Sequence, residues 1–162
     1  MTRATCLLGF FLGLAPALAA AQHTDASIER GRYLVTIAGC NDCHTEGYAE
    51  AKGNVPESEW LKGSATGFCG PWGTSYALNL RLYVTAMTED EWVAYVKDVI
   101  HLAWPPMPGY AVVKMEQADV RSLHKFIVSL GKAGGPAPYR TPHGMDPGPG
   151  PHVIFPGCQV SN

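Results

Sequence analysis

The stretch GCNDCHTE, residues 39–46, constrains this chain more than any other feature of its sequence. Cys40 and Cys43 stand three positions apart, and His44 follows the second cysteine directly. Sulfur and imidazole at this spacing serve three kinds of site: half of a structural zinc site, a redox-active dithiol, or an attachment point for covalently bound haem. Each kind demands a different partner elsewhere in the chain.

The N-terminus predicts export from the cytoplasm. Arg3 precedes the short apolar run CLLGFFLGLAPALA, and small residues offer cleavage sites after Ala19 or Ala21, which is the pattern of a secretory signal peptide. The run is short for a membrane span, which needs about 20 apolar residues. We expect a signal peptide at residues 1–21 and a periplasmic protein, with a retained N-terminal anchor as the alternative.

Charge and composition narrow the possible partners and the amount of regular structure. The chain carries 12 Lys and Arg against 14 Asp and Glu, with no block of like charge. Nucleic acid is therefore an improbable partner, because binding it needs a concentrated basic footprint. The 18 glycines and 13 prolines predict that much of the chain is loop.

Apolar periodicity predicts three main helices, at residues 25–39, from Thr88 to the prolines at 105 and 106, and at 116–130. Asp25 or Ser27 can cap the first helix, and TEDE at the start of the second is a capping box. Residues 45–87 are expected to be mostly irregular. We expect one domain at 22–132, followed by an extended Pro- and Gly-rich tail at 133–162 whose end is docked.

Two interpretations of the cysteine motif find little support elsewhere in the chain. A structural zinc site needs four ligands, and the sequence offers no second C-x-x-C and no H-x-x-x-H. A catalytic dithiol usually sits at a helix N-terminus, where the dipole lowers the thiol pKa, whereas this motif follows a helix. No alternating strand and helix pattern surrounds it either.

The third interpretation, C-x-x-C-H as an attachment motif for c-type haem, fits best. Sulfurs three residues apart can reach the two vinyl groups of one porphyrin, and His44 then lies under the ring as an axial ligand. A sixth ligand should follow far downstream, often a methionine. Met107 in WPPMPGY is the leading candidate, because flanking prolines stiffen its loop. The competing candidates are Met87, Met115, Met145 and His101.

Three stretches together resemble the class I c-type cytochromes: RGRYLVTIAGCNDCHT, PPMPGY and DVRSLHKFIVSLG, within about residues 25 to 132. GPWGTSYALNLR followed by MTEDEWVAYV is similar to the monohaem subunits that accompany periplasmic dehydrogenases. The resemblance implies an all-α fold, with three main helices around one haem and long loops. It also implies that the first and last helices cross, with Gly31 and Tyr33 meeting Phe126.

The same resemblance implies roles for residues around the haem. A proline carbonyl often fixes the other nitrogen of the ligating histidine, and Pro71 is the candidate here. Trp72, Tyr76 and Asn79 are candidates for lining the haem or approaching its propionates, with simple packing as the alternative for each. Cys69 and Cys158 match nothing that the family requires, and we predict that they form a disulfide tying the tail to the haem-side loop.

These expectations lead to an electron-transfer protein rather than an enzyme. An iron with ligands His44 and Met107 has no open position for substrate, and its environment tunes a one-electron potential. The partners would be a periplasmic dehydrogenase as donor and another cytochrome or an oxidase as acceptor. The alternatives are a haem enzyme or gas-binding sensor in which Met107 detaches, and a subunit permanently docked on a dehydrogenase.

Overall fold

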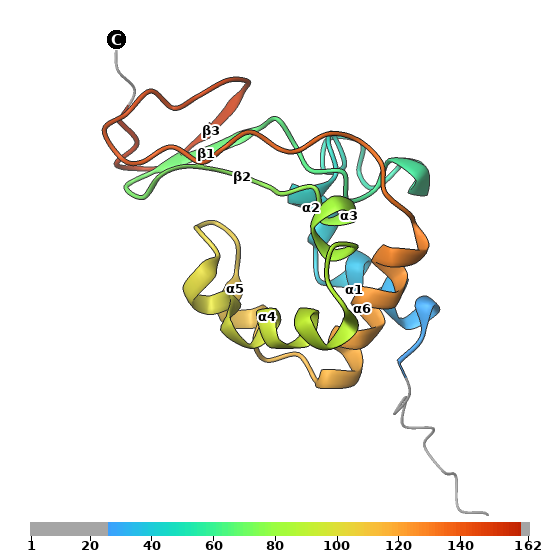
Figure 1. Ribbon diagram of the computed structural model, residues 1–162. Coiled ribbons are helices and arrows are strands. Elements are labelled where there is room, and N and C mark those ends of the chain that lie inside the picture. The colour runs from blue at the N-terminus through green and yellow to red at the C-terminus, as the bar shows by residue number, and fades with distance from the viewer. Residues whose placement is uncertain (1–25, 160–162) are drawn as a thin grey trace, which may run out of the picture.

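The computed structural model describes residues 26–159, so the signal peptide expected at residues 1–21 lies outside the described part (Figure 1). Figure 1 shows a layer of helices on one side, and strands with the last part of the chain on the other. No helix within residues 26–159 is long and apolar enough to cross a membrane. The elements are α1 (Ile28–Ile37), α2 (Cys40–His44), η1 (Glu57–Glu59), β1 (Gly67–Gly70), β2 (Gly73–Tyr76), α3 (Leu80–Val84), α4 (Glu89–Leu102), α5 (Gly109–Val112), α6 (Gln117–Ser129) and β3 (His152–Ile154).

The three main helices predicted from the sequence are present as α1, α4 and α6, which we call the helical body. Ser27 caps α1 by accepting a hydrogen bond from the Arg30 amide. Thr88 and Glu91 form the predicted capping box at the start of α4. These caps satisfy amide groups that have no partner within the helix, which fixes where each helix begins.

The helical body is held together by close packing of α1 against α6. A Cβ atom added to Gly31 would stand 2.1 Å from the Ser122 carbonyl oxygen and 2.6 Å from the Phe126 Cβ. Only glycine therefore permits this approach. Phe126 is fully buried, which confirms its expected contact with Gly31, whereas Tyr33 is 52 % exposed and lies outside the contact.

The expectation of an all-α class I cytochrome fold is wrong, because the protein is mixed α/β. Three strands form one sheet in the order β2-β1-β3. β1 and β2 pair antiparallel as a hairpin, with Gly67 opposite Tyr76, and β3 pairs parallel with β1, with Phe68 opposite Val153.

The strands were missed because their residues carry turn signals rather than alternating apolar side chains. Three of the eight strand residues of the hairpin are glycines, and Pro71 stands at its turn. The missing side chains let other backbone come close: a Cβ on Gly73 would lie 2.1 Å from the Thr141 carbonyl oxygen. The Pro- and Gly-rich tail contributes β3 as an edge strand, a position that needs fewer backbone donors.

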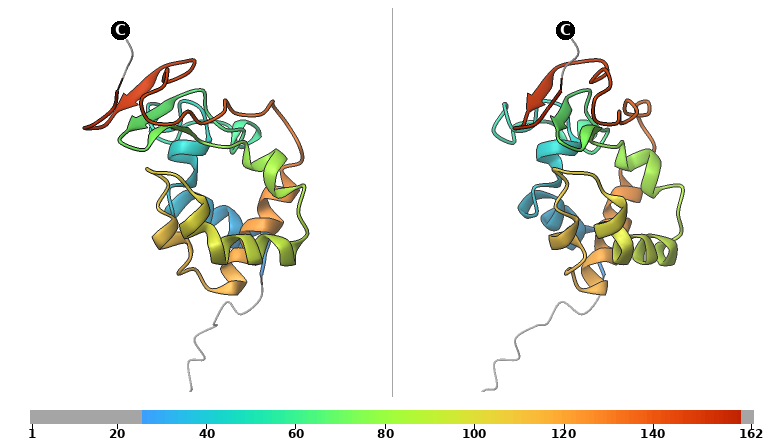
Figure 2. Two further views of the ribbon diagram at one scale, coloured as in Figure 1. Left: turned by 60° about the vertical axis from the view of Figure 1, so that its left-hand side comes forward. Right: turned by 90° about the vertical axis from the view of Figure 1, so that its left-hand side faces the viewer.

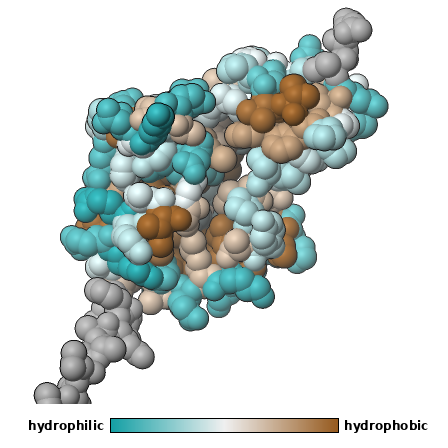
Figure 3. Space-filling model, turned by 180° about the vertical axis from the view of Figure 1, so that it is seen from behind, coloured by the Kyte–Doolittle hydropathy of each residue, from teal (hydrophilic) through white to brown (hydrophobic). Residues whose placement is uncertain are grey.

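Residues 133–159, which we call the strap, contact the hairpin region at both ends, through Asn79 and through Cys69. Figure 2 shows the strap running along the hairpin to β3. A disulfide between Cys69 and Cys158 fixes its end to β1, which confirms the predicted pairing. On the surface, Figure 3 shows a hydrophobic patch near the C-terminal end of the described chain. Val153 and Ile154 of β3 are exposed.

Candidate functional site

The cysteine motif forms a short helix of its own, α2, directly after α1. Gly39 separates the two helices with φ +68°, a left-handed conformation that glycine adopts without strain. Within α2, Cys40 and Cys43 are partly exposed, whereas Asn41 and His44 are buried. The motif therefore divides into two partly buried thiols and one imidazole held inside the protein.

The His44 ring is fixed by the backbone. Its Nδ1 lies 2.7 Å from the Leu78 carbonyl oxygen. A carbonyl can only accept, so Nδ1 carries the proton and donates, and Nε2 keeps a lone pair available to a metal. Burial lowers the pKa of His44, with the Leu78 hydrogen bond opposing the shift. The imidazole is neutral at pH 7, which is the form that ligates iron.

The carbonyl at His44 comes from Leu78 and not from Pro71, the residue nominated by the sequence. Pro71 lies exposed at the turn between β1 and β2. The hairpin carries the chain past Pro71, and the segment that follows β2 brings Leu78 to the histidine instead. Every residue has a backbone carbonyl, so the sequence alone could not identify Leu78 as the hydrogen-bond partner of His44.

The two thiols are poorly suited to thiol–disulfide exchange. Burial raises the pKa of Cys40 to about 11, and burial also raises the pKa of Cys43, with the Asp42 carboxylate adding to both shifts. A redox dithiol needs a lowered thiol pKa, because the thiolate is the nucleophile. Within residues 26–159 no three His, Cys, Asp or Glu side chains gather closely enough to hold one metal ion. The two thiols and His44 thus do not converge as zinc ligands would.

Met107 lies in the loop between α4 and α5, as predicted. Its amide donates to the Trp104 carbonyl at 3.1 Å, and its own carbonyl accepts from Gly109 at 2.9 Å, which closes a tight turn. The side chain is 36 % exposed. It borders an apolar cavity of about 250 Å³, lined by Ile100, Ala103, Pro105, Pro106, Met107, Gly109 and Tyr110.

The competing sixth ligands lie in different surroundings. Met87 and Met115 are partly buried and pack against the hydrophobic core. Met145 is 58 % exposed in the strap, and His101 lies on an exposed face of α4. Met107 is the member of this group that borders the cavity described above.

The residues proposed to line the haem hold the hairpin and the strap in place. The Trp72 indole donates to the Phe68 carbonyl at 3.1 Å, and its ring lies against Phe155. The Tyr76 hydroxyl lies 2.9 Å from the Pro147 and Pro149 carbonyl oxygens. These contacts assign packing roles to Trp72 and Tyr76.

Asn79 also binds the strap and connects it to the histidine. Its side-chain amide donates to the carbonyls of Ala133 and Gly135, at 2.8 and 3.0 Å. Its oxygen caps α3 by accepting from the Leu82 amide. Asn79, which binds the start of the strap, directly follows Leu78, whose carbonyl orients His44. One short segment of the chain therefore contacts both the strap and the histidine.

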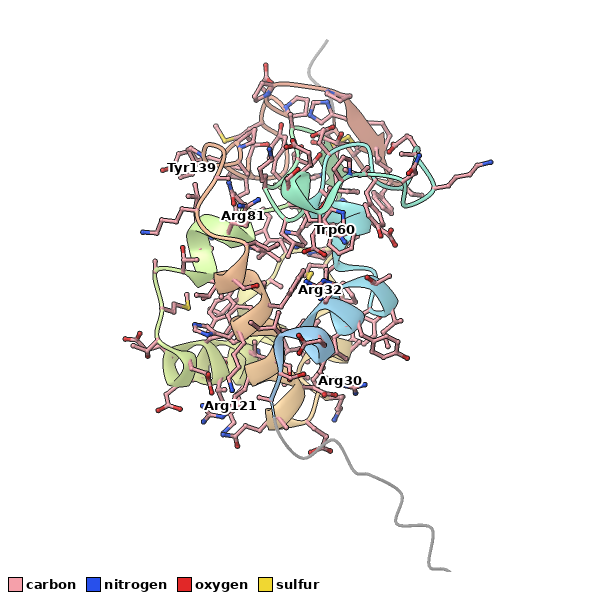
Figure 4. The ribbon with its side chains drawn as sticks, turned by 90° about the vertical axis from the view of Figure 1, so that its right-hand side faces the viewer. Arg30, Arg32, Trp60, Arg81, Arg121 and Tyr139 are labelled. Carbon is pink, nitrogen blue, oxygen red and sulfur yellow. A yellow bond between two sulfur atoms is a disulfide. The ribbon has the colours of Figure 1, made fainter. Side chains whose placement is uncertain are left out.

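Arg81 is a buried residue that the sequence gave no reason to single out. It is 6 % exposed, and its guanidinium donates to the carbonyls of Ser58, Leu130 and Gly131. Figure 4 shows it beside the C-terminal end of α6, where carbonyl groups lack helical partners. Arg81 fixes the point at which the chain leaves the helical body for the strap.

The donor set of this site suits covalently attached haem. It comprises two partly exposed thiols three residues apart, a buried neutral imidazole whose Nδ1 is hydrogen-bonded, and, on a separate loop, a thioether beside an apolar cavity whose lining includes none of the other three residues. Comparison with protein-family models, with curated proteins and with solved structures finds no match to this chain.

Proposed function

We propose that this protein is a periplasmic electron-transfer protein that carries one haem c. The observation that supports this most strongly is the state of His44 within the C-x-x-C-H motif. Its Nδ1 proton is committed to the Leu78 carbonyl, which orients the ring and leaves Nε2 as a metal ligand.

Each residue of the site would have a defined role. Cys40 and Cys43 would hold the haem through thioether bonds, formed by adding each S–H across a vinyl group. His44 Nε2 and the Met107 sulfur would be the two axial ligands of the iron, and a thioether ligand favours Fe(II). The bound group supplies a reversible one-electron change with little rearrangement.

An iron with both axial positions occupied has no place for a substrate, so we propose a carrier and not an enzyme. The donor would be a periplasmic dehydrogenase, and the acceptor another cytochrome or a terminal oxidase. Contacts with both partners would be small and brief, as is typical of redox encounters.

The test is the purified, matured protein. We expect a mass that exceeds the processed polypeptide by one haem, a low-spin spectrum, and a redox titration with a single one-electron step. The double variant Cys40→Ala/Cys43→Ala should lose the covalent haem. Colourless protein, or a mass equal to the bare chain, would overturn the proposal.

A second candidate function is a haem enzyme or gas-binding sensor in which Met107 detaches. The 36 % exposure of Met107 and the adjoining cavity favour it, since the loop leaves room beside the thioether. Carbon monoxide binding to the reduced protein separates the two. An electron carrier should bind it only when Met107→Ala opens the site, whereas a sensor should bind it rapidly as the wild type.

A permanently docked dehydrogenase subunit is a third possibility, favoured by the exposed apolar pair Val153 and Ile154 on β3. Size-exclusion chromatography of a native extract distinguishes the two cases. A free carrier elutes as a small protein, and a docked subunit elutes with the dehydrogenase.

A further inference from the structure

We propose that Arg140 is a positioning residue for Met107, and that the strap reaches the methionine loop through it. This inference rests on the proposed function, because it concerns how firmly the thioether is held as an axial ligand. Arg140 lies outside the C-x-x-C-H motif, in the strap near the C-terminal end of the sequence.

The contact that carries this inference joins the strap to the residue that begins the Met107 turn. The guanidinium carbon of Arg140 lies 4.2 Å from the centroid of the Trp104 ring. Tryptophan is the aromatic side chain that binds a cation most strongly. The Trp104 carbonyl accepts the hydrogen bond from the Met107 amide at 3.1 Å, so the residue under the guanidinium also closes the Met107 turn.

Arg140 can act in this way because its backbone is anchored. The next residue, Thr141, pairs with Thr74 of β2 through two hydrogen bonds, of 2.8 and 2.9 Å. Gly73 lies directly under this crossing and has no room for a side chain. The guanidinium therefore projects from a segment that is fixed against the hairpin.

The hairpin also holds the methionine loop from the other side. The Ser75 hydroxyl donates to the Pro105 carbonyl at 2.5 Å. Figures 1 and 2 show the loop rising from the end of α4 towards β2. Thr74 and Ser75 are neighbouring residues of β2. This strand therefore binds both the segment that carries Arg140 and the loop that carries Met107.

No ion pair among residues 26–159 involves Arg140, and its side chain is exposed. Its described interaction is the one with Trp104. A cation–π contact at an exposed site corresponds to about a two- to fivefold change in an equilibrium constant. Without it, the fraction of molecules with Met107 detached should rise by that factor, and the apparent affinity for a competing ligand should rise equally.

The experiment measures imidazole binding to the oxidised holoprotein by absorption spectroscopy. Imidazole competes with Met107 for the iron, so its dissociation constant reports how firmly the thioether is held. Arg140→Ala should bind imidazole about two to five times more tightly than wild type. Arg140→Lys should fall between them, because lysine keeps the charge but not the flat guanidinium.

Arg32→Ala is the matched control. Arg32 is also an exposed arginine over an aromatic ring, with its guanidinium carbon 5.2 Å from the centroid of Phe126. It lies on α1 and pairs with Glu57, away from the methionine loop. Its removal should leave imidazole binding unchanged, whereas a general loss of stability would affect both variants.

Met107→Ala separates failure of this inference from failure of the proposed function. If Met107→Ala binds imidazole much more tightly but Arg140→Ala equals wild type, the positioning role is wrong and the ligation stands. If Met107→Ala changes nothing, the ligation is wrong and the positioning role falls with it. Should Arg140→Ala fail to fold, Trp104→Phe and Arg140→Lys carry the same test, and unchanged binding in both overturns the role.

Discussion

The helical body and the region formed by the hairpin and the strap are stabilised in different ways. In the helical body, apolar side chains such as Val35, Val96 and Phe126 are almost fully buried, so the packing energy is spread over many contacts. The strap buries few apolar side chains. It is fixed by one disulfide, by β3, and by hydrogen bonds from Tyr76 and Asn79.

This difference indicates where the protein should open first. A segment with few buried apolar contacts can open while the remainder stays folded. The strap also contacts both sides of the candidate site, through Asn79 next to Leu78 and through Arg140 over Trp104. The packed body supplies most of the stability, and the strap adjusts the surroundings of His44 and Met107.

Removing the disulfide should have the largest effect on the free energy of unfolding. It also tests directly whether the strap region opens before the helical body. Cys69 and Cys158 are 89 residues apart, and in the chain-entropy model a closed loop of this length stabilises by about 4–5 kcal/mol. We expect the Cys69→Ser/Cys158→Ser variant to lose this amount in chemical denaturation. In hydrogen exchange, amides of β1 and β3 should become exposed before those of α1 and α6. Simultaneous exposure of all four elements would contradict the division into two regions.

Truncating a core side chain should have the next largest effect on the free energy of unfolding. It should also speed hydrogen exchange in the helical body instead of the hairpin and strap. Phe126 is fully buried against Gly31, and Phe→Ala in a core costs about 3–5 kcal/mol. We expect Phe126→Ala to lower the free energy of unfolding by this amount and to speed exchange throughout the helical body. Phe126→Leu, which refills most of the volume, should lose less. A loss below about 1 kcal/mol for the alanine variant would show that this contact is not central.

A smaller change, at the contact between Tyr76 of β2 and the strap, sharpens the comparison. Tyr76→Phe removes the hydroxyl that lies 2.9 Å from the carbonyls of Pro147 and Pro149 while keeping the ring. We expect a loss of about 1 kcal/mol, the usual net value of one hydrogen bond. Limited proteolysis should cut the strap faster in this variant, with the helical body unaffected. Identical cleavage rates would mean that the hydroxyl does not hold the strap.

The smallest expected effect lies at the start of α4 and depends on pH. The backbone amide of Thr88 donates to the Glu91 carboxylate at 2.7 Å and, together with the Thr88 hydroxyl, lowers the pKa of Glu91. This stabilisation is complete above the usual glutamate pKa and is lost as the pH falls through the lowered value. Comparison of thermal unfolding for wild type and Glu91→Gln across the acid range checks this. The variant should lack the part of the pH dependence that Glu91 contributes, and equal slopes would refute it.

The sequence predicted the helical body well because helix signals are local. The capping box at Thr88 and Glu91 and the apolar period of α6 lie within a few residues of the groups they affect. The hairpin and β3 were missed because they depend on contacts between distant segments. Gly67 pairs with both Tyr76 and His152, and nothing near Gly67 in the sequence announces these partners.

The candidate site also has one part that the sequence could predict and one part that it could not. Cys40, Cys43, His44 and Met107 were identified from a motif and a stiff loop, and their roles in holding haem stay a prediction. Their supporting groups could not be predicted. The carbonyl of Leu78 carries no side-chain signal, and Arg140 reaches Trp104 only because the strap returns across the hairpin.

The four cysteines of the described chain stand in opposite chemical states, and this has a consequence for how the molecule is made. Cys69 and Cys158 are oxidised to a disulfide, while Cys40 and Cys43 are free. Four thiols can pair completely in three ways, and every one of these pairings would consume Cys40 and Cys43, the sulfurs that the proposed haem attachment needs. The proposed attachment therefore requires that the two thiols of the motif stay reduced until haem is bound, and an expression host that oxidises thiols indiscriminately should yield mixed disulfide isomers rather than one product.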